Sequence, residues 1–202
     1  MKIAGIVLAG GQSSRFGEPK ALATWRGKTF IEHSIEALKE VVTDIVVISH
    51  PAITNDLSHI LHVPVVEDIA LYKGNGPLAG LLTGMEFVDA DWYIVAPCDT
   101  PNVSKEWAMT FIERVDEAYE AIVPLVEGRK QPLLALYHHR AKEKIEQLLK
   151  EGQRSMQGLL SQCNTQYVTA DESQLPKGLF FNVNTKEEYS QLQNRKWITE
   201  NI

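Results

Sequence analysis

Cysteine is scarce in this chain, which has only Cys98 and Cys163 among its 202 residues. Two cysteines so far apart exclude a disulfide scaffold, and no Cys-x-x-Cys pair indicates a zinc or thioredoxin-like site. Long hydrophobic runs are missing too, since none approaches the roughly 20 residues that cross a membrane. The apolar start at residues 1–8 lacks the flanking features of a signal peptide. We therefore expect a cytoplasmic protein with no membrane association.

Positive charge is in deficit. The chain has 20 Lys and Arg residues against 26 Asp and Glu residues, which gives a formal net charge of −6. Nucleic-acid and membrane-surface binders carry basic faces, so the acidic balance argues against both kinds of partner. A small anionic ligand stays compatible, because a phosphate site needs only a few local groups. The ordinary globular composition and the lack of a linker predict a single domain over residues 1–202.

Short apolar runs rich in β-branched residues alternate with amphipathic segments. The runs predict strands at 3–8, 45–48, 63–66, 92–96, 121–125 and 133–137. Helical spacing and capping signals predict helices at 30–42, 78–88, 105–115, 141–150 and from 186 onward, the third capped by Ser104 and the last opened by Thr185 and Glu188. This alternation predicts an α/β fold, a three-layer αβα sandwich with a mostly parallel, Rossmann-like sheet. Residues 127–182 have an irregular pattern and are expected to embellish it.

Polar features follow three of the predicted strands. Residues 10–20 follow the first strand, Asp68 follows the third and Asp99 follows the fourth. Ligands of parallel α/β sheets bind beyond the carboxyl ends of the strands. The three features are therefore expected to converge at one edge of the sheet.

The loop after the first strand reads LAGGQSSRFGEPK at positions 8–20. Its glycines let backbone N–H groups approach a phosphate, and Arg15 and Lys20 would add charge-assisted contacts to a triphosphate. A plain strand-to-helix turn is the alternative, and it explains Gly10 and Gly11 better than it explains the two basic residues. The loop matches neither the Walker A pattern nor the usual dinucleotide fingerprint.

Several other candidates each admit two interpretations. Asp99 suits a metal ligand or a helix cap, although Ser104 is available for the capping. Asp68 is either a ligand contact or an exposed loop residue. Arg154, in a turn between two helices, either holds a phosphate or is solvated at a helix end. Cys98 is expected to be a small buried residue rather than a nucleophile.

The loop at 8–20 resembles the signature of nucleotidyltransferases with a glycosyltransferase-A-like fold. Within that group, the chain resembles the molybdenum cofactor guanylyltransferase family from residue 3 into the last predicted helix. The narrower resemblance is carried by VED at 66–68, GPLAG at 76–80, PCDTP at 97–101 and NVNT at 182–185. The first loop is shared with sister families, whereas PCDTP together with NVNT is more specific. The resemblance implies the nucleotide-diphospho-sugar transferase fold.

The resemblance also implies a reaction: transfer of GMP from GTP to the terminal phosphate of molybdenum-molybdopterin, with release of pyrophosphate. It implies that Asp99 holds Mg²⁺, and that Asn182 and Asn184 lie near the acceptor phosphate or the metal. Other cofactor-pathway proteins and recipient molybdoenzymes are the implied partners. Carried onto the matching positions, the resemblance implies catalytic roles for Arg15, Lys20 and Asp99, and nucleotide contacts for Leu8, Ala9, Gly10, Gly11, Lys20, Asp68 and Asp99.

One departure bears on base selectivity. Some relatives carry an Asn where this chain has Ile48, and an Ile side chain cannot hydrogen-bond guanine. Ser49 or His50 would have to compensate, so guanine over cytosine stays open. Two alternatives follow: a sister transferase for cytidine or for a sugar or isoprenoid phosphate, and a nucleotide-binding partner protein without turnover.

Overall fold

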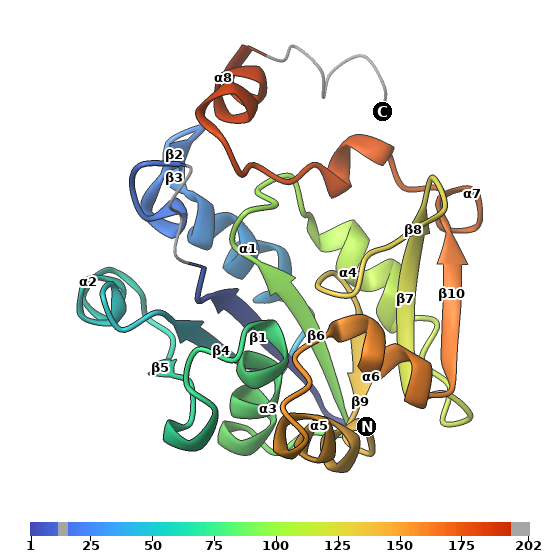
Figure 1. Ribbon diagram of the computed structural model, residues 1–202. Coiled ribbons are helices and arrows are strands. Elements are labelled where there is room, and N and C mark those ends of the chain that lie inside the picture. Colours follow the sequence, from blue (N-terminus) through green and yellow to red (C-terminus); the bar gives the residue numbers. More distant parts are fainter. Residues whose placement is uncertain (12–15, 195–202) are drawn as a thin grey trace.

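The computed structural model describes residues 1–11 and 16–194, and in these residues a sheet of eight strands forms the centre of the molecule (Figure 1). The strand order is β10-β7-β9-β6-β1-β4-β5, with β8 paired to β7. Its parallel part consists of β1 (Ile3–Ala9), β4 (Asp44–Ser49), β5 (Val65–Glu67) and β6 (Trp92–Pro97). The predicted mostly parallel sheet is confirmed.

The other half of the sheet is mixed. It contains β7 (Ala121–Val126), β8 (Arg129–Lys130), β9 (Leu136–His138) and β10 (Thr165–Thr169), and β9 runs antiparallel between β6 and β7. The predicted strand at 133–137 is wrong at its start. Leu134 N–H donates to Gln131 O and closes a turn there, so pairing begins at Leu136. β10 lies in the irregular segment and was not predicted as a strand.

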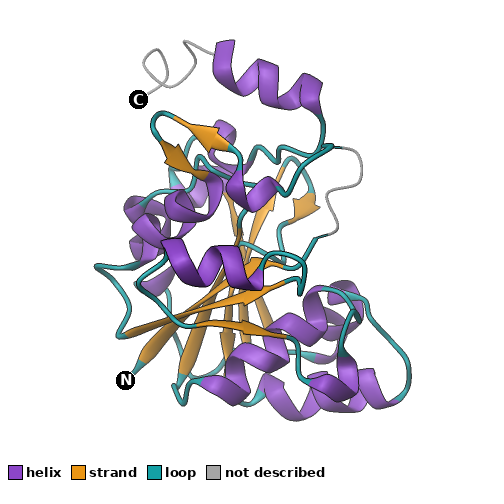
Figure 2. Ribbon diagram, turned by 90° about the vertical axis from the view of Figure 1, so that its left-hand side faces the viewer, coloured by secondary structure: helices purple, strands orange, loops and turns teal. Residues whose placement is uncertain are grey.

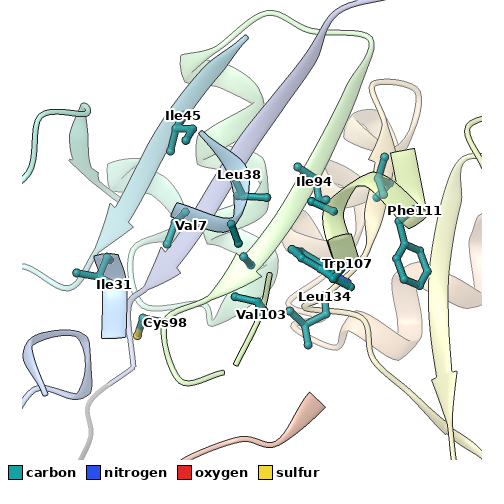
Figure 3. Packing of buried hydrophobic residues seen from close by; sticks show 14 of the residues in the cluster. Val7, Ile31, Leu38, Ile45, Ile94, Cys98, Val103, Trp107, Phe111 and Leu134 are labelled. Atoms are coloured by element: carbon teal, nitrogen blue, oxygen red, sulfur yellow. The ribbon is translucent and has the colours of Figure 1, made fainter. Parts of the chain in front are cut away.

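Helices cover both faces of the sheet, as Figure 2 shows, so the three-layer prediction is confirmed. Residues of β1 alternate between the faces because side chains of a strand have a period of two. Ile3 and Val7 pack with α1 (Phe30–Leu38), α2 (Thr54–Ile60) and α4 (Lys105–Ile112), in the cluster drawn in Figure 3. Ala4 and Ile6 pack with α3 (Pro77–Phe87), α5 (Ala141–Lys150) and α6 (Met156–Gln162).

Helix starts were predicted better than helix ends. Ser104 Oγ accepts the Trp107 N–H at 3.4 Å, which confirms the predicted cap of α4. The predicted helix at 30–42 ends at Leu38 instead, where the carbonyl of Leu38 accepts from Val41 and Val42 in a closing turn. The helix after Ser104 likewise ends before 115, and α2 was not predicted.

A close approach fixes α3 over β1. A Cβ atom at Gly84 would lie 2.5 Å from Ile6 Cδ1 and 2.7 Å from its Cγ1, closer than real Cβ contacts come. Glycine at this position therefore lets the helix backbone rest on the strand. The amino end of α3 is thereby held beside the carboxyl end of β1.

A third apolar cluster joins the two ends of the chain. Phe16 packs with the hairpin of β2 (Thr24–Trp25) and β3 (Lys28–Thr29) and with α8 (Lys186–Asn194). Tyr189 Oη also donates to Thr24 O at 2.5 Å. The C-terminal helix thus supports the loop that follows β1.

The remaining short elements are α7 (Ala170–Ser173) and 3-10 helices at Lys20–Leu22, Ala70–Tyr72 and Lys177–Phe180. Among residues 1–11 and 16–194, none of the helices has the length and apolar character needed to span a bilayer.

Candidate active site

A cavity of about 410 Å³ lies at the carboxyl ends of β1, β4, β5 and β6, within the size range of small-molecule sites. Part of its lining comes from the three polar features predicted to converge, so that convergence is confirmed. These lining residues are Leu8, Ala9, Gly10, Gly11, Lys20, Asp68, Cys98 and Asp99.

Lys20 and Asp99 form an ion pair inside this site. Lys20 Nζ donates to Asp99 Oδ2 at 2.8 Å and to Asn184 Oδ1 at 2.7 Å. The side chains of Lys20 and Asp99 are only 11% and 21% exposed, so water screens their attraction little. Three segments far apart in sequence therefore meet at one ammonium group.

Backbone contacts hold the segment 182–185 against the end of β6. Val183 N–H donates to the Asp99 carbonyl at 2.8 Å, and Thr100 Oγ1 donates to Asn182 Oδ1. The Glu188 carboxylate accepts the N–H groups of Asn184 and Thr185 at 2.7 and 2.9 Å, which confirms the predicted capping of α8. Asn184 is thereby fixed beside Lys20.

Asp68 is half-buried at the end of β5. Its Oδ2 accepts the Gly74 N–H at 3.1 Å. Burial raises the pKa of the Asp68 carboxyl above its ordinary value, because a low-polarity environment disfavours the charged form. A ligand that donates hydrogen bonds to this carboxylate would offset that cost.

Cys98 is buried, and burial raises the pKa of its thiol to about 12. The reactive form of cysteine is the thiolate. Cys98 therefore stays protonated at neutral pH, which agrees with the prediction of a small buried residue.

Two oxygen atoms suited to a hard cation converge in the site. Asp99 Oδ2 and Asn184 Oδ1 both accept hydrogen bonds from the Lys20 ammonium. The two oxygens therefore stabilise a positive charge at the position of this ammonium group. Within the described ranges, no group of three or more His, Cys, Asp or Glu side chains is arranged so that it could hold a metal ion by itself. Mg²⁺ usually takes one or two protein oxygens and completes its shell with water and substrate phosphates. The donor set therefore fits Mg²⁺ bound together with a nucleotide.

Comparison with known proteins places this geometry in a family. Residues 5–167 match the model of the MobA-like NTP transferase domain. The chain belongs to this family. A probable molybdenum cofactor guanylyltransferase of Bacillus cereus is 58% identical over 95% of this chain and 96% of its own length. A protein of the same name from Bacillus cytotoxicus is 57% identical over 94% and 96%.

A solved structure supports the same placement of the MobA-like chain. Molybdopterin-guanine dinucleotide biosynthesis protein A from Archaeoglobus fulgidus superposes with a TM-score of 0.80 and is 26% identical, covering 96% of this chain and 97% of its own. The share of this chain that is covered, 96%, is larger than the part that the family model matches, residues 5–167.

Some predicted site residues of this MobA-like chain lie apart from the cavity. Arg154 is exposed in the turn between α5 and α6, and it is absent from the cavity lining. Asn182 is exposed, with its side-chain oxygen bonded to Thr100. Arg15 lies outside the described residues, together with positions 12–14.

The strand end at 48–50, expected to bear on base selectivity, does reach the cavity, where Ile48 in β4 and His50 directly after it are part of the lining. Sequence reasoning assigned no site role to three glycines of the lining, Gly74, Gly76 and Gly80, which lie in α3 and the loop before it. Gly74 and Gly76 have φ values of +77° and +74°, a backbone conformation that favours glycine. The available signal was the GPLAG segment itself, which follows Asp68 closely in sequence.

Proposed function

We propose that this protein transfers GMP from GTP to the terminal phosphate of molybdenum-molybdopterin, with the help of Mg²⁺. The observation that carries the proposal is that Lys20 and Asp99, which line the cavity of this MobA-like chain, form an ion pair that Asn184 joins through its hydrogen bond with Lys20. The names of relatives that match nearly the full chain support guanylyl transfer in particular.

The reaction brings two anions together. An oxygen of the acceptor phosphate attacks the α-phosphorus of GTP, and the bond between that phosphorus and the pyrophosphate oxygen breaks. Lys20 donates hydrogen bonds to the phosphates and offsets their charge. Mg²⁺, when bound, supplies further charge neutralisation there. Catalysis then consists mainly of positioning and electrostatic stabilisation.

The remaining residues bind and orient. The N–H groups of Gly10 and Gly11 lie at the end of β1, where they suit phosphate oxygens. Asn184 fixes the Lys20 ammonium, and Asp99 supplies a carboxylate for the metal. Burial raises the pKa of the Cys98 thiol to about 12, so Cys98 stays protonated, and the proposal is direct transfer to the acceptor.

Acceptor binding is the less defined half of the proposal. Asn184 is part of the site, and Asn182 adjoins it through Thr100. Arg154 reaches the acceptor only if the molybdopterin extends out of the cavity toward α6. We also propose that cofactor-pathway proteins deliver the acceptor and that molybdoenzymes receive the product.

The test is calorimetric titration with GTP, CTP, UTP and ATP, each with and without Mg²⁺, followed by an assay of dinucleotide formation. We expect preferential GTP binding that strengthens with Mg²⁺, and release of pyrophosphate once molybdenum-molybdopterin is added. A preference for CTP would assign the chain to a sister transferase. GTP binding without any pyrophosphate release would indicate a partner protein that lacks turnover.

A further inference from the structure

The carboxyl end of β4 presents three consecutive residues to the region of the cavity. Ile48 and His50 line the cavity, whereas Ser49 does not. The Ser49 hydroxyl is buried, 2.8 Å from Thr54 Oγ1 and 3.3 Å from the Val66 carbonyl. Ser49 and His50 are the two neighbours of the apolar Ile48 that could hydrogen-bond a base in its place. The Ser49 hydroxyl already makes its hydrogen bonds within the protein. His50 is the polar side chain that this strand end offers to a ligand.

The His50 ring is held in one protonation pattern when it is neutral. Its Nδ1 accepts the Ala52 N–H at 3.2 Å, so the ring proton resides on Nε2. The His50 backbone is fixed as well, since its carbonyl accepts from Ile53 N–H at 3.0 Å and from Thr54 Oγ1 at 3.2 Å. His50 thus carries an Nε2–H donor, when neutral, on a side chain that is part of the cavity lining.

The surrounding wall suits a flat heterocycle. Ile48, Ile53 and Pro77 supply apolar surface. At Gly80 a Cβ atom would meet Leu8 Cδ2 at 2.9 Å, so the bare backbone there keeps the wall clear. Asp68 adds a carboxylate acceptor to the same wall.

We propose that His50 selects guanine by donating its Nε2–H to the guanine O6 atom. Guanine carries an acceptor at this position, whereas adenine carries an amino donor that would face the His50 donor. Guanine also offers N–H donors beside O6, and the Asp68 carboxylate accepts such donors. The inference rests on the proposed use of GTP, and it explains how a strand end with Ile48 still reads the base.

The experiment measures binding of nucleotides to the intact protein by calorimetry, with no acceptor present. Wild type and His50→Ala are titrated with GTP, with inosine triphosphate, which keeps O6, and with 2-aminopurine riboside triphosphate, which lacks it. His50→Ala is expected to weaken GTP and inosine triphosphate by about tenfold each, the worth of one hydrogen bond, while the 2-aminopurine nucleotide is unaffected. His62→Ala, which changes an exposed histidine near the amino ends of β4 and β5 and outside the cavity lining, is the matched control.

A second variant separates recognition from folding. His50→Gln keeps an N–H donor and is expected to regain part of the preference for GTP over the 2-aminopurine nucleotide, whereas His50→Ala loses it. Equal weakening of all three nucleotides by His50→Ala would overturn the inference, because His50 would then serve the ribose, the phosphates or the fold. If wild type prefers CTP, the proposed guanylyl transfer fails first. If wild type prefers GTP and His50→Ala changes nothing, only the role of His50 fails.

Discussion

The Lys20 ammonium donates to the Asp99 carboxylate at 2.8 Å across 79 positions of sequence. The pair joins the loop after β1 to the end of β6, and Asn184 adds a third contact from the C-terminal segment. The cation proposed to bind phosphate and the carboxylate proposed to bind the metal are thus held side by side. In the proposed mechanism, binding of nucleotide and metal replaces the Lys20–Asp99 contact by contacts of Lys20 with phosphate and of Asp99 with the metal.

Removing the charge of Asp99 is expected to abolish transfer while leaving the fold intact. Asp99→Asn keeps the size of the side chain but withdraws the carboxylate proposed for Mg²⁺. The rate of pyrophosphate release should fall by at least about 100-fold, with a thermal midpoint close to that of wild type. Asp89→Asn, an exposed carboxylate outside the cavity, is the control. Unimpaired turnover of Asp99→Asn would refute the metal role.

Lys20→Ala is expected to weaken GTP binding far more than acceptor binding. Loss of a charge-assisted contact to phosphate corresponds to about 1.5–3 kcal/mol, or roughly 10- to 100-fold in the dissociation constant. Lys28→Ala removes an exposed lysine of the hairpin and should leave GTP binding unchanged. Equilibrium titrations with GTP and with molybdopterin separate the two effects. The reverse order of losses would assign Lys20 to the acceptor.

Gly84→Ala tests the close packing of α3 on β1. The added methyl group would meet Ile6 at 2.5 Å, so the helix has to shift, at a cost of about 1–3 kcal/mol in the free energy of unfolding. Gly158→Ala in α6 is the matched control, since its nearest neighbours lie at 3.6 Å or more. Because alanine is the better helix former, that control should be neutral or more stable by up to about 1 kcal/mol. The measurement is urea denaturation of wild type and both variants. Equal free energies of unfolding for Gly84→Ala and Gly158→Ala would contradict the close contact of α3 with Ile6.

Stability is expected to fall as the pH drops from 7.5 to 5.5, through His138. This residue is buried, and burial lowers the pKa of its imidazole below the ordinary value. In the unfolded chain the His138 imidazole binds a proton near pH 6.5, whereas in the folded protein it binds one only at lower pH. Protonation therefore stabilises the unfolded state relative to the folded state below about pH 6.5. The contribution of neutral His138 to the free energy of unfolding is complete above about pH 6.5. It is lost as the pH falls toward the lowered pKa of His138 in the folded protein.

The measurement is the free energy of unfolding at both pH values for wild type and His138→Asn. The Asn oxygen replaces Nδ1 as the acceptor of the Arg140 N–H, a bond of 3.3 Å in the wild type. The variant should lose about 1 kcal/mol less than wild type between the two pH values. The exposed His62→Asn serves as the control. An unchanged pH slope in His138→Asn would show that another group is responsible.

Local patterns in the sequence predicted the core of the fold and the segments that carry the chemistry. Alternation in β1 and the caps at Ser104 and Thr185 depend on near neighbours, so they could be read from the residues directly. β9 and β10 escaped correct prediction because strands distant in the sequence decide their pairing. The observed helix ends differ from the predicted ones for a related reason, because tertiary packing influences where the last turn of a helix closes.

The sequence by itself determined the α/β layers, the loop after β1 and the three strand ends that carry polar residues. Only the tertiary structure decided which of those residues meet. It brought Asn184 within 2.7 Å of Lys20 across 164 positions, left Arg154 exposed, and engaged Ser49 while His50 lines the cavity. Helix and strand propensity and hydrophobic periodicity depend on residues close together in the sequence. A site is assembled when helices and sheets that are distant in the sequence bury their apolar faces against one another, and the local sequence does not say which faces will meet.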